Sequence, residues 1–432
     1  MTTAMAAALR RIQLGNALAA FGNGFTVPFL FVYVARVREL GDGTAGAVLA
    51  AFAAAALLVL PFTGRVIDRS GPLVMVVVGA VSAALGALGF GLSTSAPAVL
   101  VASAVMGAGI AVLQPALATM IVWSSTPGSR SRAFATQFFL NNLGLGVGGL
   151  LGGMLVDEHH PASFTLLFVI EATMFLVLLA VLVTVRVGRP AAVAAGAESA
   201  ADGSGWGVLL RDRSMVLLCV LGFVIFFACY GQFESGLSAY AVEVTRISTS
   251  TLGIALAANT AMIVLAQFVV LRLVERRRRS RVVALVGLIW TVAWLAAGAS
   301  GLVHGAQAVA TALLIGTYAL FGVGETMLSP TVAPLVADLA PARLVGQYNS
   351  AFALVKQLAL AVGPAVGGAL AAAGAWSAYI VLLVVSCLGV TGLALVLGRR
   401  LTEREDRPGS VIVARGDAAR PVLEEQRADV VR

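Results

Sequence analysis

Residues that build catalytic or metal centres are rare in this sequence. There are three cysteines and three histidines in 432 residues, and the cysteines lie in apolar runs without paired spacing. Such cysteines behave as small buried apolar side chains. No serine or cysteine has a histidine placed to activate it, as a nucleophile requires, and no metal-ligand cluster can be assembled. We therefore expect no metal, no cofactor and no enzyme activity.

Charge is scarce as well. Charged residues make up 12% of the chain, hydrophobic residues make up 59%, and the mean hydropathy is +0.95. Soluble domains carry about 25% charged residues. The apolar residues form runs of about 20, the length of a membrane-spanning helix, whereas a β-barrel would show alternating segments of about ten residues. The composition predicts an all-α polytopic membrane protein that is surrounded by a lipid bilayer.

Twelve apolar runs are predicted to be transmembrane helices. They cover residues 14–35, 44–62, 73–94, 97–122, 135–156, 163–185, 214–240, 250–273, 282–302, 307–331, 347–373 and 376–398.

The inner segments divide these helices into two groups. A small-residue and glycine-rich stretch at 186–213 is typical of a flexible linker and separates two six-helix bundles, 1–185 and 214–398. The segment 399–432 has few large apolar residues, so we expect a disordered cytoplasmic tail.

The basic residues predict the orientation of the chain. With the N-terminus inside, nearly all of the 29 lysines and arginines fall in inner loops or in the tail. This is a strong positive-inside pattern, so both termini are assigned to the cytoplasm. The net charge of +8 is then topogenic, and we expect no nucleic-acid partner.

The two halves contain a parallel repeat. With a shift of 215 residues, 106–155 lies over 321–370 without a gap, and five glycines and one proline match in register. Because six spans separate the copies, both have the same orientation. Parallel six-plus-six repeats are one architecture of secondary transporters, with the substrate near the midplane between the halves.

A polar octet, GRVIDRSG at 64–71, separates the second and third spans and predicts a tight surface loop. Gly64, Asp68, Arg69 and Gly71 match the signature G-x-x-x-D-R-x-G of the major facilitator superfamily, although a proline and a leucine replace the basic pair that usually follows. With the span count, the linker and the repeat, the chain resembles this superfamily over residues 10–400.

The resemblance implies a conformational latch at this octet. Asp68 would hold an end of the fifth or eleventh span in the outward-facing state, since a helix N-terminus favours a nearby carboxylate. A solvated turn with only topogenic charge is the alternative. The predicted latch residues are Gly64, Asp68, Arg69, Gly71 and, in the cognate loop of the second half, Glu275.

The fifth and eleventh spans contain glycine-rich runs that resemble an element of drug:proton antiporters. Such runs let helices approach closely and bend, and ordinary tight packing is the alternative. An arginine that many members of that branch carry in the fourth span is absent, because Ser103 stands there. The predicted bending positions are Pro115, Gly148, Gly152, Pro330, Gly363, Pro364 and Gly367.

Ionisable residues inside spans are costly and are functional candidates. Glu325 and Lys356, the only lysine, lie at similar depths where the first copy has Ile110 and Asn141. We interpret Glu325 as a protonatable carboxylate whose proton affinity a nearby cation modulates; the alternative is a structural salt bridge. Glu171 in the sixth span is a third candidate for proton coupling, or a packing residue on a peripheral helix.

Sparse polar groups among aromatic residues predict the substrate site. Asn16 and Asn23 lie on one face of the first span, two helical turns apart. An apolar lining with few polar anchors suits lipophilic compounds better than sugars. The predicted substrate-binding residues are Asn16, Asn23, Gln114, Tyr230, Gln232 and Glu234, of which Glu234 is equally consistent with a polar cap at the outer mouth.

We therefore predict a monomeric transporter of the plasma (inner) membrane that exports lipophilic drug-like or secondary-metabolite compounds in exchange for protons. The two bundles would rock around a midplane site. Proton-coupled uptake or facilitated transport of a small metabolite is the main alternative. A membrane sensor or an intramembrane enzyme is a further one.

Overall fold

The computed structural model describes residues 3–157, 160–185, 187–188, 205–233, 235–303 and 305–407. Within these ranges every regular element is helical, and 12 helices are long and apolar enough to cross a membrane. The predicted all-α fold with twelve membrane helices is confirmed. Glu234, which we predict to bind substrate, lies outside the described residues.

The first six spans form one bundle. They are α1 (Thr3–Thr26), which continues through η1 (Val27–Phe29), α2 (Leu30–Val32) and η2 (Tyr33–Val37), then α3 (Gly41–Ser70), α4 (Pro72–Leu92), α5 (Ala96–Trp123), α6 (Pro127–Leu155) and α7 (Pro161–Val183). Within this bundle α1 packs against α6 and α7, while α5 packs against α3 and α4.

The last six spans form a second bundle with its own apolar core. They are α10 (Arg213–Ala228) with α11 (Tyr230–Phe233) and α12 (Gly236–Glu243), α13 (Thr249–Val274), α14 (Arg279–Ser300), α15 (Gln307–Leu328) with α16 (Val332–Leu339), α17 (Val345–Ala372) after the short turn η3 (Ala342–Leu344), and α18 (Trp376–Gly398). Two short helices, α9 (Gly205–Arg211) and α19 (Glu403–Asp406), occupy the end of the predicted linker and the start of the predicted tail.

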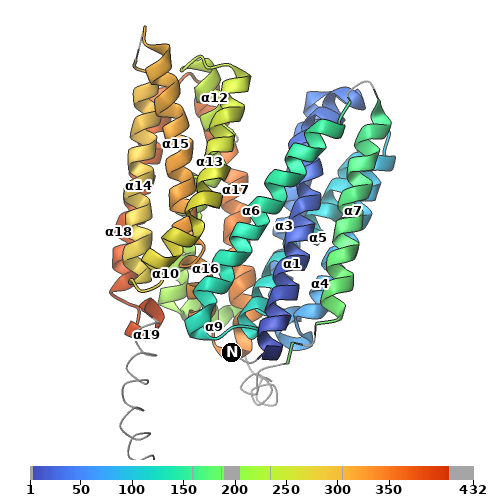
Figure 1. Cartoon of the computed structure of the whole chain (residues 1–432), viewed down its shortest axis with the longest axis vertical. Coiled ribbons are helices and arrows are strands. Elements are labelled where there is room, and N and C mark those ends of the chain that lie inside the picture. The colour runs from blue at the N-terminus through green and yellow to red at the C-terminus, as the bar shows by residue number, and fades with distance from the viewer. Residues whose placement is uncertain are drawn as a thin grey trace, which may run out of the picture.

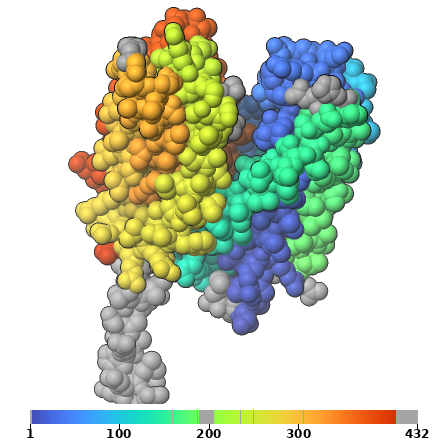
Figure 2. All heavy atoms as spheres, turned by 45° about the horizontal axis from the view of Figure 1, so that its top comes forward, coloured from blue at the N-terminus to red at the C-terminus, as the bar shows by residue number. Residues whose placement is uncertain are grey.

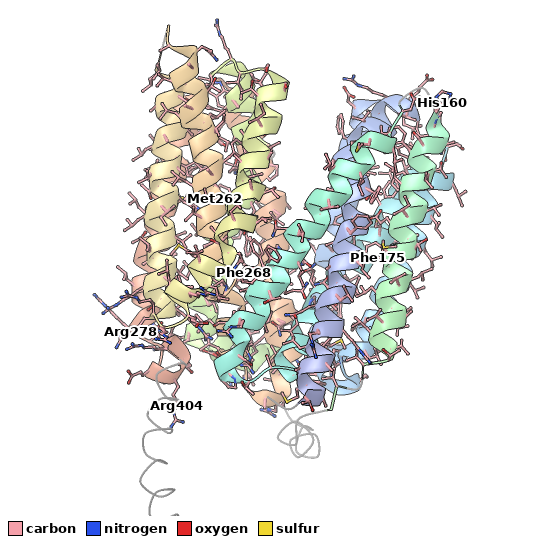
Figure 3. All side chains as sticks on the ribbon, in the orientation of Figure 1. His160, Phe175, Met262, Phe268, Arg278 and Arg404 are labelled. Carbon is pink, nitrogen blue, oxygen red and sulfur yellow. The ribbon has the colours of Figure 1, made fainter. Side chains whose placement is uncertain are left out.

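The two bundles stand side by side and diverge toward one face (Figure 1). The N-terminus and α19 lie at the opposite face, where the bundles meet, and we call this the terminal face. Figure 2 shows the hollow between the bundles, which opens toward the face away from the N-terminus and α19, the open face. Arg278 and Arg404 lie at the terminal face and His160 at the open face (Figure 3).

The prediction of a surface loop at 64–71 is wrong for all but its last residue. The α3 helix continues to Ser70, and only Gly71, with a φ of +86°, makes the turn into α4. The Gly71 N–H donates to the carbonyl of Ile67 at 2.9 Å, and a proline begins the next helix, a usual pairing of glycine stop and proline start. Polar side chains end an apolar run without ending the backbone hydrogen bonds of a helix, so hydropathy placed the boundary too early.

Two predicted spans are interrupted. The seventh breaks after Ala228 into α10, α11 and α12, and the tenth breaks between α15 and α16. Pro330 lies at the second break and cannot donate a helical hydrogen bond. These interruptions bring irregular backbone close to the space between the bundles.

Candidate functional site

A cavity of about 470 Å³ lies between the two bundles. Residues of α1, α3, α5 and α6 form one side, and residues of α10, α11, α15, α16 and α17 form the other. The lining is mostly apolar. Its aromatic members are Phe52, Phe134, Phe138, Phe226, Tyr230 and Phe352, its amide members are Asn16, Gln114, Gln137, Asn141, Asn349 and Gln357, and its charged members are Glu325 and Lys356.

The sequence repeat continues into this cavity. Nine pairs of lining residues are related by the shift of 215 positions, and each bundle supplies one member of each pair. The pairs are Ile110 and Glu325, Gln114 and Ser329, Leu117 and Val332, Ala118 and Ala333, Ile121 and Val336, Phe134 and Asn349, Gln137 and Phe352, Phe138 and Ala353, and Asn141 and Lys356. The backbone is therefore pseudo-symmetric around the cavity, while both charges come from the second bundle.

Glu325 is held at the edge of the cavity by a neutral donor. Its side chain is buried in α15, and the Asn259 amide on α13 donates to Oε1 at 2.9 Å. The same amide donates to the carbonyl of Tyr318 at 3.3 Å. Tyr230 of α11 is also within interaction range of the carboxyl group. A carboxyl group fixed by neutral partners can gain or lose a proton without breaking an ion pair.

Lys356 lies on α17 and also lines the cavity. Its Nζ is 5.3 Å from the centre of the Phe226 ring, in cation–π range. Among the described residues, no carboxylate oxygen lies within the 4.0 Å that defines an ion pair with this ammonium group. The salt bridge that we consider as an alternative is thus not formed in this state.

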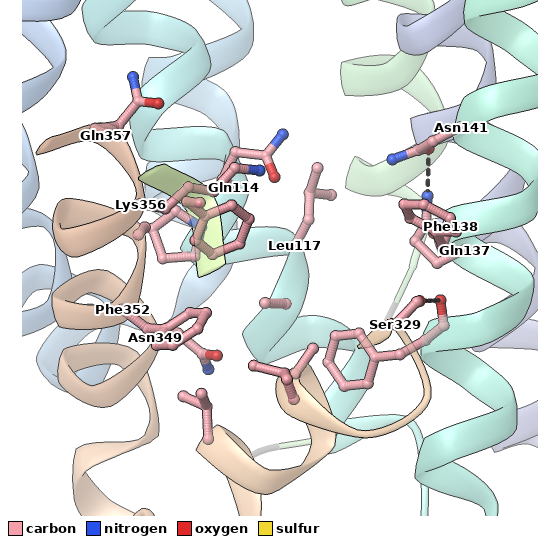
Figure 4. A pocket seen from close by; sticks show the side chains of 18 of the residues that line it. Gln114, Leu117, Gln137, Phe138, Asn141, Ser329, Asn349, Phe352, Lys356 and Gln357 are labelled. Atoms are coloured by element: carbon pink, nitrogen blue, oxygen red, sulfur yellow. Dashed lines mark hydrogen bonds between the residues drawn. The ribbon is translucent and has the colours of Figure 1, made fainter. Parts of the chain in front are cut away.

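The predicted polar residues differ in how they meet the cavity. Asn16, Gln114 and Tyr230 line it. On α6, the Gln137 amide donates to Asn141 Oδ1 at 2.7 Å (Figure 4). In that view Lys356 and Gln357 on α17 lie across the cavity from Gln137 and Asn141. At the related positions 141 and 356, the first copy of the repeat therefore presents an amide and the second copy a cation.

Two of the predicted substrate-binding residues lie away from this lining. Gln232 does not line the cavity. It is fully buried, and its amide donates to the carbonyl of Gly363 at 2.9 Å, which ties α11 to α17. Asn23 does not line the cavity, and its Oδ1 is buried without a hydrogen-bond partner in the described part of the chain. Hydropathy and spacing identify a helical face, but they do not say which neighbour that face meets.

Glu171 is enclosed between α7 and α1, outside the cavity. A Cβ added at Gly22 would lie 3.2 Å from the Glu171 Cα, so the two helices are in close contact there. Thr26 is adjacent, but its hydroxyl donates to the carbonyl of Asn23 at 3.4 Å. Neither carboxyl oxygen of Glu171 has a hydrogen-bond partner among the described residues.

At the terminal face, Asp68 joins the two bundles. Its Oδ1 accepts the N–H of Gly346 at 2.7 Å and its Oδ2 accepts the N–H of Gln347 at 3.0 Å. These N–H groups belong to the first turn of α17, where no helical carbonyl is available to them. The carboxylate therefore caps α17 from the other bundle.

Of the remaining predicted latch residues, Gly64 takes part in this contact. Gly64 lies so close to α17 that an added Cβ would be 2.5 Å from the Gln347 Cα. Gly71 provides the turn after α3, and Arg69 is exposed. In the cognate loop, Glu275 forms an ion pair with Arg132 across the bundles at 3.4 Å.

A second contact across the bundles is buried. Asp338, at the end of α16, accepts from Arg130 of α6 through Oδ1 and from Arg279 of α14 through Oδ2, the latter at 2.6 Å. The Arg279 side chain is only 4% exposed. One carboxylate therefore bridges two guanidinium groups and joins α6 to the second bundle.

Sequence reasoning missed the hydrogen-bond donor to Glu325, which is Asn259, and the cluster of Asp338 with two arginines. Asn259 is a polar residue in the middle of an apolar span, so its position carried a detectable signal. Arg130, Arg279 and Asp338 lie near span ends, where their charges explain topology equally well. Only the folded chain shows that they meet.

The predicted bending positions are three prolines and four glycines, and the two residue types have different roles. Pro330 interrupts a span, whereas Pro115 and Pro364 lie inside continuous helices. Gly148 contacts the backbone of α1 at Phe21, and an added Cβ at Gly363 would lie 2.8 Å from the Gly231 Cα. Gly152 lies against Phe25 and Phe29, and Gly367 against Gln232. The glycines are thus points of close helix contact.

Comparisons with known proteins agree with this architecture. The profile described as Major Facilitator Superfamily matches residues 12–296 and 237–428. An uncharacterised MFS-type transporter of Escherichia coli, YdeE, is 25% identical over 359 residues, which cover 81% of this chain and 85% of YdeE. Multidrug resistance protein 2 of Bacillus subtilis is 31% identical over 150 residues, 33% of this chain and 36% of that protein.

Solved structures share the fold. A bacterial homologue of the iron transporter ferroportin, in an outward-facing state, superposes with a TM-score of 0.75 at 15% identity, over 91% of this chain and 99% of that one. The fucose:proton symporter FucP of Escherichia coli gives 0.73 at 15% identity, over 90% and 97%. The chain belongs to the Major Facilitator Superfamily and is a membrane transporter, not an enzyme.

Proposed function

We propose that this chain is a proton-coupled secondary transporter that exports lipophilic, drug-like organic compounds. The observation that carries the proposal is the lining of the cavity, which combines six aromatic side chains with scattered amides and one protonatable carboxyl group. A cavity of about 470 Å³ has the size of sites for drug-sized ligands, which are also mostly apolar with few polar anchors. The partial likeness to Multidrug resistance protein 2 supports export.

To assign a direction of transport, each face of the protein must be assigned to one side of the membrane. We propose that the terminal face is cytoplasmic, since the inner loops hold nearly all basic residues. The state described here is then outward-facing, with Asp68 and Asp338 holding the cytoplasmic ends of the bundles together. Opening to the cytoplasm would break these contacts, and a cycle between the two states would carry the substrate across the membrane.

Protons would act at Glu325. A carboxylate in an apolar site is costly when ionised, so protonation removes a charge and changes the relative free energies of the outward-facing and inward-facing states. Lys356 modulates this site through its charge. We propose Glu171 as a second proton site, because its carboxyl group is buried between α1 and α7 and its oxygens have no hydrogen-bond partner in the described ranges.

Reconstituted protein tests the function. In proteoliposomes with an imposed pH gradient, export predicts that a lipophilic fluorescent substrate moves against its own gradient in exchange for protons. Collapse of the pH gradient by an ionophore should stop this movement. Substrate flux that ignores the pH gradient would contradict proton coupling, and absence of flux from an otherwise folded protein would contradict transport of that substrate class.

Proton-coupled uptake is the second candidate. The ammonium group of Lys356, which forms no ion pair among the described residues, favours it for substrates that carry a negative charge, because an anion bound there would favour a protonated Glu325. Transport in right-side-out and inverted vesicles separates the two directions, since export and uptake respond to opposite pH gradients.

A further inference from the structure

Lys356 lines the cavity and forms no ion pair among the described residues. It is the only lysine of the chain, and no other basic residue lines the cavity. In the described part of the chain its ammonium group has no ion pair within 4.0 Å and no hydrogen bond, and its neighbour is the face of the Phe226 ring. A cation in a mostly apolar space loses hydration and needs a compensating partner.

The one acid in the lining does not supply that partner. Glu325 Oε1 accepts from Asn259, on the α13 side of the carboxyl group. The pseudo-symmetric position of Lys356 is Asn141, whose Oδ1 is already bonded to Gln137. The charge of Lys356 is therefore balanced at a distance by Glu325, while none of the described residues accepts a hydrogen bond from its ammonium group.

We propose that the cavity binds amphipathic organic anions, with the acidic group of the substrate on Lys356 and its apolar part against the aromatic lining. Phe226 and Phe352 lie beside Lys356 in the lining, and Phe138 lies on the facing helix α6. Gln357, next to Lys356, also lines the cavity and can donate a hydrogen bond to the same acidic group. The inference rests on the proposed function of the cavity as a substrate site and adds a second substrate class, which would move with the proton.

The anion and the proton would bind together. The titratable groups that face Glu325 are Lys356 on α17, Tyr230 on α11 and Cys229 at the end of α10. Of these only Lys356 is a cation, so an anion bound to it would repel an ionised Glu325 and would be favoured by a protonated one. An anionic substrate would then travel in the same direction as the proton, and exchange for protons would be confined to neutral and cationic compounds.

The experiment compares two probes of equal size that differ in charge, naphthaleneacetate and naphthaleneacetamide. Their affinities for purified protein in detergent are measured by isothermal titration calorimetry. A charge-assisted hydrogen bond predicts that wild type binds the carboxylate at least about tenfold more tightly than the amide. Lys356→Met should abolish this preference, Lys356→Arg should retain most of it, and Leu358→Met, at an exposed position of the same helix, should not change it.

Glu325→Gln tests the link to the proton. The variant mimics the protonated carboxyl group, so it should bind naphthaleneacetate at neutral pH at least as tightly as wild type does at acidic pH. Weaker binding to Glu325→Gln at every pH would overturn the joint binding of anion and proton.

Equal affinity of wild type for the two probes, no saturable binding of the carboxylate, or an anion preference that survives in Lys356→Met would overturn the anion site. These results are independent of transport. Proton-driven flux of a neutral lipophilic compound without any anion preference would leave the proposed function intact and refute only this inference. Anion binding without flux of either probe would support the anion site and contradict the proposed transport.

Discussion

The Asp68 carboxylate on α3 caps the first turn of α17 by accepting the N–H of Gly346 at 2.7 Å. The residues lie 278 positions apart and in different bundles. The contact uses backbone donors that exist only because α17 begins at this point, and the positive end of the helix dipole adds to it. Such a contact can break as a unit when the two helices separate and can form again when they come together.

Asp68→Asn should weaken the closed terminal face. The asparagine side chain has one carbonyl oxygen, so it can replace at most one of the two charge-assisted hydrogen bonds, and its NH₂ group cannot accept. We expect a loss of about 2 kcal/mol, or about a thirtyfold shift toward the state that is open at the terminal face, and loss of transport with normal expression. Double electron–electron resonance between labels at His160 and Leu302, both at the open face, would report a shorter distance.

Asp42→Asn is the matched control for that variant, because Asp42 is exposed in the first turn of the same helix. It should transport like wild type. Wild-type transport by Asp68→Asn with unchanged label distances would mean that the contact is only a structural cap.

Gly64→Ala should separate α3 from α17. A Cβ at Gly64 would lie 2.5 Å from the Gln347 Cα and 2.9 Å from its N, and backbone atoms cannot move aside as side-chain ends do. We expect the same shift in label distances and at least tenfold lower flux. Gly43→Ala in the same helix is the control, since nothing lies within 4 Å of its added Cβ. Equal flux in both variants would refute the close contact.

Arg130→Ala should loosen the second contact between the bundles. It removes the partner of Asp338 from the first bundle while the ion pair of Asp338 with Arg279 stays in the second. We expect reduced flux and a shift toward opening at the terminal face. Arg132→Ala should have little effect, because its pair with Glu275 is 3.4 Å long, its own side chain is 69% exposed, and exposed pairs contribute about 0–1 kcal/mol.

Glu325→Gln should uncouple transport from the pH gradient. The amide cannot release a proton, while its shape preserves the contacts of the cavity, so binding of a neutral lipophilic substrate should persist while driven transport is lost. Flux with and without a pH gradient, measured in proteoliposomes, reports both properties. Glu243→Gln, at the exposed end of α12, is the control. Driven transport at wild-type rates by Glu325→Gln would sink the assignment.

Glu171→Gln should flatten the dependence of flux on pH and leave substrate affinity unchanged, because Glu171 lies outside the cavity lining. The measurement is the initial rate of flux across a series of pH values. Thr173→Val, whose hydroxyl bonds only within its own helix at 2.7 Å, provides a neighbouring control. An unchanged pH profile would make Glu171 a neutral packing group.

The sequence by itself determined the membrane class, the twelve helices and the repeat. Apolar runs of bilayer length report local free energies of transfer, and each run carries this signal without its neighbours. The repeat also predicted correspondences that the cavity contains, such as Asn141 with Lys356, because related helices fold into related positions. For the same reason Glu325 could be singled out as a charge where the other copy has an isoleucine.

The tertiary structure alone decided which polar groups meet. Gln232 and Glu325 both look like polar residues of cavity helices, but one ties α11 to α17 and the other faces the space between the bundles. Asp338 has the sequence signature of any charge at a helix end, yet it joins two arginines from different bundles. A hydrogen bond depends on the rotation and separation of two helices, which no single helix encodes, so contacts across the bundles appear only when the whole chain is packed.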